Sequence, residues 1–102
     1  MKANATLFGE TTEVELVVNS YQAGGRPAII AMCEDGVYGV VTVNDTKTVL
    51  AEDEILVKTW TESVWVTQLL EQLPHVFKDT GRRVPMGYAH AQIWKFNREE
   101  VR

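Results

Sequence analysis

Apolar and polar residues alternate with a period of two along much of this chain. Between Glu13 and Tyr21, the residues Val14, Leu16 and Val18 share one face, while polar side chains occupy most of the other. This pattern is typical of a half-buried strand. Other strand-like runs are predicted at residues 5–8, 28–34, 37–44, 55–60 and 87–96.

Two turn signals separate these runs. Asp35-Gly36 lies between the runs 28–34 and 37–44 and predicts a β-hairpin, because such turns favour residues that tolerate positive φ. Gly24-Gly25, followed by Pro27, predicts a second turn.

One helix is predicted, over residues 63–73. Trp65, Leu69 and Leu73 are spaced four residues apart, and Val66 and Leu70 widen this apolar stripe. The proline that follows Leu73 ends the helix. We therefore expect a single α+β domain over residues 1–102, with a mostly antiparallel sheet of five or six strands and one helix packed on one face.

Composition narrows the class of protein. The 102 residues carry a net charge of −4, and Cys33 is the one cysteine. The acidic balance disfavours direct binding to nucleic acid, which needs a basic stripe. A lone cysteine fits a reducing, cytoplasmic setting, and no apolar run has the length of a signal peptide or a membrane span.

A basic cluster surrounds Thr80-Gly81. Lys78, Arg82 and Arg83 could hold an anion such as a phosphate together with the backbone amides of a turn there. The alternative is a solvated turn whose arginines pair with nearby carboxylates such as Asp79.

The last predicted strand is the second candidate site. Because alternate residues of a strand share one side, this side carries aromatic, histidine, amide and methionine side chains: Met86, Tyr88, His90, Gln92, Trp94 and Phe96. Such a face is a binding surface if it is exposed, because tyrosine and tryptophan favour interfaces, and half of a core if it is buried. Both alternatives are open, and the core alternative is stronger for Trp94 and Phe96.

The carboxylates and potential metal ligands of the sequence do not indicate a catalytic site or a metal site. An acidic face that mimics DNA phosphates is a further hypothesis, formed by Glu10, Glu13, Glu15, Glu34 and Asp35. Cys33, His75 and His90 are scattered and lack metal-ligand spacing, so we expect no metal site, no cofactor and no catalytic residue. A hydrolase or transferase with His90 as its base is the weakest alternative.

Several short motifs carry a family resemblance along nearly the whole chain. They are Phe8-Gly9, Glu34-Asp35-Gly36 with Tyr38, Thr42-Val43-Asn44, Trp65, Thr80-Gly81-Arg82 and Gly87-Tyr88. In their order and spacing the chain resembles small bacterial and mobile-element proteins grouped as domain of unknown function 4313. The resemblance implies a chromosomal island, plasmid or phage setting, and it implies no catalytic residue.

These observations lead to a functional expectation. We expect a small non-enzymatic protein that binds a host or element-encoded protein, such as an inhibitor of a bacterial defence system of the anti-CRISPR or anti-restriction type. The alternative is a protein that sequesters a nucleotide or another small ligand with Arg82, Arg83, Tyr88 and Trp94. Weak homodimerisation through an exposed strand is a further expectation.

Overall fold

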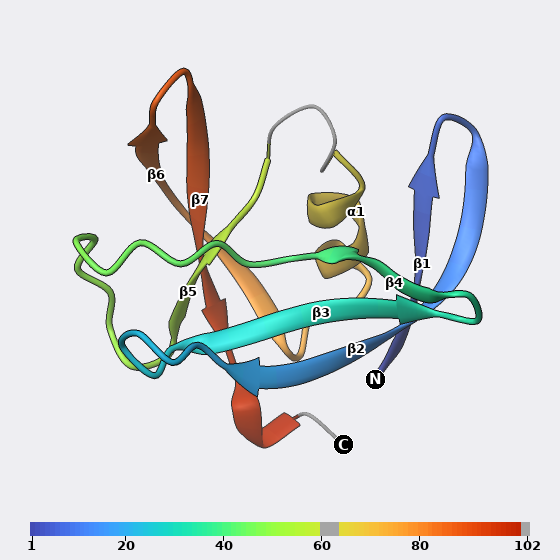
Figure 1. The fold of residues 1–102 in the computed structure, drawn as a ribbon, viewed down its shortest axis with the longest axis horizontal. Coiled ribbons are helices and arrows are strands. Elements are labelled where there is room, and N and C mark those ends of the chain that lie inside the picture. Colours follow the sequence, from blue (N-terminus) through green and yellow to red (C-terminus); the bar gives the residue numbers. More distant parts are fainter. Residues whose placement is uncertain (60–63, 101–102) are drawn as a thin grey trace.

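In the residues that the structure describes, the fold consists of seven strands, one α-helix and a short 3-10 helix (Figure 1). We describe residues 1–59 and 64–100 of a computed structural model. The elements are β1 (Lys2–Leu7), β2 (Glu10–Ser20), β3 (Pro27–Cys33), β4 (Gly36–Val40), β5 (Glu54–Val57), α1 (Trp65–Glu71), β6 (Phe77–Met86), β7 (Ala89–Phe96) and η2 (Arg98–Glu100).

The strands form two antiparallel sheets in the orders β1-β2-β3-β4 and β5-β7-β6. A bridge between Thr42 and Val57 joins them, and the N–H of Val43 donates to the carbonyl of Leu56 at 3.1 Å. Helix α1 contacts both β1 and β6, so it lies between the two outer strands of the joined sheets. The mostly antiparallel α+β architecture with one helix is confirmed, but the expected five or six strands are too few.

The missed strand is β6, for which the sequence indicated a turn at Thr80-Gly81. In the structure these two residues form a β-bulge, because the pairing with β7 jumps from Asp79 to Arg82. Gly81 has a φ of +83° there, and its N–H donates to Oδ1 of Asp79 at 2.9 Å. A bulge, charged residues and a proline, Pro85, all protect an edge strand from pairing with another chain.

Hairpin turns also differ from the prediction. The first turn is Phe8-Gly9, so Phe8 lies outside the strand although the run 5–8 included it. Strand β7 starts at Ala89, because Gly87-Tyr88 forms the turn between β6 and β7. The hairpin of β3 and β4 is present, although Glu34-Asp35 is its turn.

The helix packs the predicted stripe against the sheets. Trp65, Val66, Leu69 and Leu70 are buried. Helix α1 ends at Glu71, two residues short of the predicted limit, and Gln72 is its C-cap. Ser63, where we expected the helix to begin, lies outside the described residues, as does Trp60.

A β-bulge in β4 makes room for Trp65. The extra residue lets both Tyr38 and Gly39 face inward, and the Tyr38 ring meets the Trp65 ring edge-on with centroids 5.0 Å apart. A Cβ atom at Gly39 would lie 2.5 Å from the Trp65 ring. Glycine is therefore required where the indole crosses β4.

Two apolar clusters cover opposite faces of β7. Trp94 and Phe96 belong to the main core, which contains residues of both sheets and α1. Ala91 and Ile93 belong to a second cluster with Leu56, and the segment between β4 and β5 packs Val43 and Leu50 against this cluster. The aromatic side of the last strand is therefore core at its C-terminal end.

Candidate interaction surface

Both predicted anion-binding arginines have carboxylate partners. The Arg82 guanidinium pairs with Glu54, which is 8% exposed and also accepts a hydrogen bond from the N–H of Ala51 at 2.9 Å. Arg83 Nη1 lies 3.1 Å from Asp79 Oδ1. The hydrogen bond that Arg83 donates lowers the pKa of Asp79, and the hydrogen bond from the N–H of Gly81 lowers it further. Both arginines therefore form ion pairs within the protein. For Arg83 and Asp79 this is the pairing that the alternative to an anion site expected.

The binding residues predicted on the last strand are separated. Tyr88 is fully exposed in the turn before β7, and His90 is exposed on the strand. Gln92 is half-buried and accepts a hydrogen bond from Nε1 of Trp94 at 2.8 Å. Trp94 is only 3% exposed, so the hypothesis of one aromatic binding surface is wrong for this residue.

The predicted acidic face is divided between two sides of the sheet. Glu10 shares its face with Val14 and Leu16, whose side chains are buried. Burial is the main cause that raises the pKa of Tyr38, and the Cys33 and Glu10 groups add to this effect.

Glu13 and Glu15 point to the opposite, outer side of β2. Glu15 Oε2 lies 2.8 Å from the N-terminal ammonium, and Glu13 Oε1 lies 3.9 Å from Nζ of Lys2. Glu34 and Asp35 are exposed in the turn between β3 and β4. The five predicted carboxylates therefore do not form one continuous face, and two of them are partly neutralised.

An apolar surface that the sequence analysis missed lies on the outside of the four-stranded sheet. Pairing aligns Val17 with Ile30 and Val40 in one row, and Met32 with Val37 in the next. Their strand neighbours, including Leu16 and Ile29, face the core, so these residues point outward. We call this set the outer sheet face: Val17, Ile30, Met32, Val37 and Val40.

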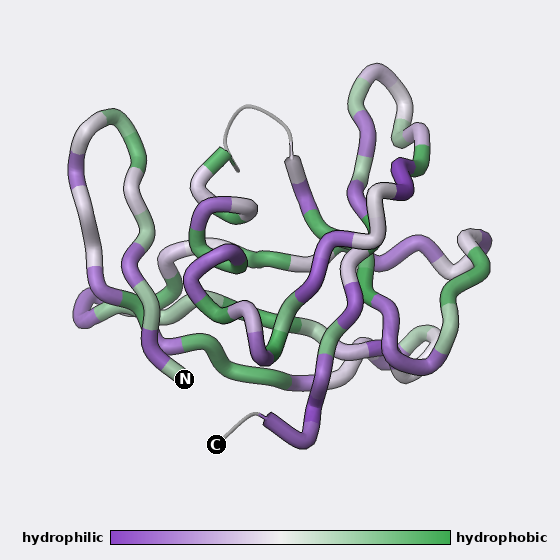
Figure 2. The backbone as a smooth tube through the Cα atoms, turned by 180° about the vertical axis from the view of Figure 1, so that it is seen from behind, coloured by the Kyte–Doolittle hydropathy of each residue, from purple (hydrophilic) through white to green (hydrophobic). Residues whose placement is uncertain are grey.

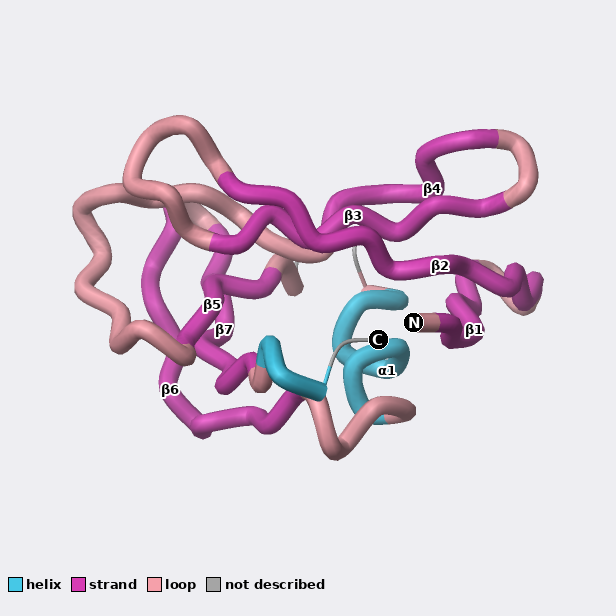
Figure 3. Tube along the Cα trace, turned by 90° about the horizontal axis from the view of Figure 1, so that it is seen from below, coloured by secondary structure: helices cyan, strands magenta, loops and turns pink. Residues whose placement is uncertain are grey.

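The outer sheet face is open to solvent. Val37 is 64% exposed and Val17 is 38% exposed, while Ile30, Met32 and Val40 are partly exposed. Seen from below, β2, β3 and β4 form the outermost layer, and α1, β5, β6 and β7 lie on its other side (Figure 3). Within the described part of the chain, no helix or strand covers this face.

Two sequence signals pointed to this face. Val17 interrupts the otherwise polar side of the strand at 13–21, and residues 28–33 are apolar on both sides. A strand that is apolar on both sides is usually buried on both sides, as β7 is here. Sequence alone does not say whether the second side is covered within the chain.

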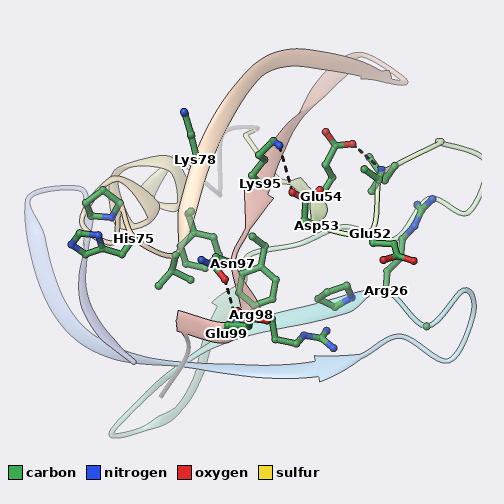
Figure 4. Close-up of a pocket in the computed structure, with 18 of the residues that line it drawn as sticks. Arg26, Glu52, Asp53, Glu54, His75, Lys78, Lys95, Asn97, Arg98 and Glu99 are labelled. Atoms are coloured by element: carbon green, nitrogen blue, oxygen red, sulfur yellow. Dashed lines mark hydrogen bonds and ion pairs between the residues drawn. The ribbon is translucent and has the colours of Figure 1, made fainter.

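A groove of about 950 Å³ lies away from the outer sheet face (Figure 4). The turn before β3, the segment before β5, the turn after α1 and the end of β7 line it. The segment after β7 also lines it, through Asn97, Arg98 and Glu99. Figure 2 shows that this segment is hydrophilic. Among the described residues that line it, the cations Arg26, Lys78, Lys95 and Arg98 match in number the carboxylates Glu52, Asp53, Glu54 and Glu99.

Internal contacts occupy much of the charge in this groove. Lys95 Nζ lies 3.5 Å from Asp53 Oδ2. Arg26 donates hydrogen bonds to the carbonyls of Asp45 and Thr48, where it fixes the loop after β4. The groove therefore has no excess of positive charge for a phosphate. Of the candidate binding residues named from the sequence, only Lys78 and Phe96 line it.

In residues 1–59 and 64–100, no three His, Cys, Asp or Glu side chains are close enough to share a metal ion. The same ranges contain no helix of sufficient length and apolarity to cross a membrane. Comparison with protein families, with curated proteins and with solved structures gave no match.

Proposed function

We propose that this protein is a small non-enzymatic interaction protein that binds a protein partner with its outer sheet face. One observation carries the proposal, which is that apolar side chains from three adjacent strands meet on a face that no described element covers. Contiguous exposed apolar surface on a small soluble domain is characteristic of interaction sites.

The charges around the face favour a basic partner. Glu13, Glu15, Glu34 and Asp35 lie toward one end of it, while Lys2 and the N-terminal ammonium offset only part of their charge. A complementary partner surface would have an apolar centre and lysine or arginine at that end. The excess negative charge also disfavours a second copy of this chain as the occupant.

The biological setting is part of the same proposal. The resemblance described above supports a phage or mobile-element origin, and a small acidic domain suits an inhibitor of a host defence protein. Such an inhibitor would act by covering a working surface of its target. Close mimicry of DNA phosphates has less support, because the carboxylates are divided between two sides of the sheet.

Affinity purification with matched variants tests the proposal. A tagged Val17→Glu/Val37→Glu variant places charges within the outer sheet face, at positions exposed enough to leave folding intact. Val49→Glu is the control, because Val49 is 88% exposed and lies on the segment between β4 and β5. We expect wild type and control to retain one stoichiometric bacterial protein that the double variant loses by at least tenfold.

Two results would contradict the proposal. Equal recovery of the partner by the double variant would show that another surface binds it. Absence of a stoichiometric partner for the wild type, in lysates of every plausible bacterial host, would remove the interaction function. Circular dichroism of the double variant provides the folding control.

A nucleotide-sequestering protein is the alternative, with weaker support. Arg82 and Arg83 pair with carboxylates, Trp94 is buried, and the groove has balanced charge. A thermal-shift screen against nucleotides tests it, since a ligand that binds the native state raises the melting temperature. A clear shift would favour this alternative over the interaction protein.

A further inference from the structure

Phe8 occupies an unfavourable backbone conformation at the tip of the β1–β2 hairpin. It has a φ of +52°, and it is the one described residue other than glycine with positive φ. Together with Gly9, whose φ is +81°, it forms a two-residue turn between paired Leu7 and Glu10. Turns of this shape favour Asn-Gly, because an aromatic residue pays a steric penalty at positive φ.

No contact among the described residues offsets this penalty. The Phe8 side chain is 91% exposed, so it gains almost no burial. An asparagine or glycine at this position would suit the turn better and would remove an exposed aromatic ring. Local rules that are broken without an internal gain usually mark functional positions.

The β1–β2 hairpin projects from the body of the protein (Figure 1), and Phe8 lies in its turn. Thr6 Oγ1 and Thr11 Oγ1 are 3.0 Å apart across the two strands. Deeper in the hairpin, the Gln72 side chain bonds to the backbone of Asn4. The ring is therefore presented by a braced element, which lowers the entropy cost of binding.

We infer that Phe8 is an anchor that inserts into an apolar pocket on a protein partner. Aromatic side chains in desolvated pockets contribute much of the affinity at protein interfaces. A protein pocket fits better than a membrane surface, because the chain is acidic and Glu10 follows the turn. The anchor is a different site from the outer sheet face and rests on a different observation.

Three variants separate the strain from the aromatic ring. Phe8→Asn relieves the strain and removes the ring, so we expect a melting temperature roughly 4 °C higher and a partner affinity at least tenfold weaker. Phe8→Ala removes the ring and keeps the strain, so we expect the weaker affinity with an unchanged melting temperature. Val49→Asn, at another exposed apolar position, should change neither quantity.

The measurements are differential scanning calorimetry and quantitative capture of the partner by the tagged protein. Full capture by Phe8→Ala would overturn the anchor, as would a melting temperature of Phe8→Asn no higher than that of wild type. If Val17→Glu/Val37→Glu loses the partner but Phe8→Ala retains it, the anchor is refuted and the outer sheet face remains supported. The reverse pattern would sink the outer sheet face alone.

Other occupants give distinct results. Phe8-dependent binding to phosphatidylcholine vesicles would replace the protein pocket by a membrane. A dimer in analytical ultracentrifugation that Phe8→Ala dissociates would replace it by a second copy. Either result overturns the inference, and so does a wild-type protein that captures no partner.

Discussion

The Gln72 side chain joins the end of α1 to the outer edge of β1. Its Oε1 accepts a hydrogen bond from the N–H of Asn4 at 2.9 Å, and its Nε2 donates to the carbonyl of the same residue at 2.6 Å. A neighbouring antiparallel strand would make the same pair of bonds. Gln72 thus occupies a strand-pairing position on the edge of the sheet.

Replacing Gln72 should measurably destabilise the fold. Each hydrogen bond contributes about 0.5–1.5 kcal/mol, and because both lie at the surface we expect Gln72→Ala to cost about 1–2 kcal/mol. In a domain of this size that lowers the melting temperature by roughly 5–10 °C. Glu71→Ala, at the neighbouring exposed helix position, is the control and should have little effect.

Gln72→Glu tests the geometry of the contact. At pH 7 a carboxylate keeps the bond from Asn4 N–H but faces the Asn4 carbonyl without a proton to donate. We expect it to be at least as destabilising as Gln72→Ala. Below about pH 4 the protonated acid donates again, so its melting temperature should rise relative to that of Gln72→Ala.

Thermal melts followed by circular dichroism at pH 7 and pH 3 provide the measurement. The reasoning is refuted if Gln72→Ala has the melting temperature of the wild type, or if Gln72→Glu and the wild type have the same melting temperature at pH 7.

Two further predictions concern the arginines of β6. Arg82→Ala should lower the free energy of unfolding by roughly 2–3 kcal/mol, because it leaves the buried Glu54 carboxylate without its partner; this value allows for the screening of Arg82, half of which is exposed. In a double-mutant cycle measured by denaturation, Glu54→Gln should restore part of this loss. No restoration would show that the two residues are not coupled. Arg83→Ala should destabilise by less than about 1 kcal/mol at pH 7, since its partner Asp79 is more than a third exposed. Because the pKa of Asp79 is lowered in the folded state, this stabilisation is present above the ordinary carboxyl pKa of about 3.9 and is lost as the pH falls further. A difference in stability between wild type and Arg83→Ala that persists at pH 2 would contradict this ion pair as its source.

Strand and helix periodicity predicted the parts of the fold that pack on one side. The stripe of α1 and the inner face of β2 appear as expected, since each element buries a single face. The edge strand β6 was missed because its bulge at Thr80-Gly81 has the residue signature of a turn. Local composition cannot distinguish a bulge that is paired to a partner strand from a turn that reverses the chain.

The candidate sites were harder to predict, because they depend on which side of each strand is covered. Arg82 resembles an anion ligand in the sequence, but Glu54, which pairs with it, lies 28 residues away along the chain. Trp94 resembles an interface residue, but it lies in the main core. Residues 28–33 resemble a buried strand, but one of its sides is open.

The two sides of the fold place similar side chains in different surroundings. Strand β7 has buried apolar residues on both sides, and the segment between β4 and β5 covers its second side with Val43 and Leu50. Strand β3 is also apolar on both sides, but no described helix or strand lies over its outer side. Stability of the isolated domain would favour polar residues on that open side, just as it would favour asparagine in place of Phe8. Both departures concern apolar groups held in solvent by well-paired strands, and the partner proposed above would account for both.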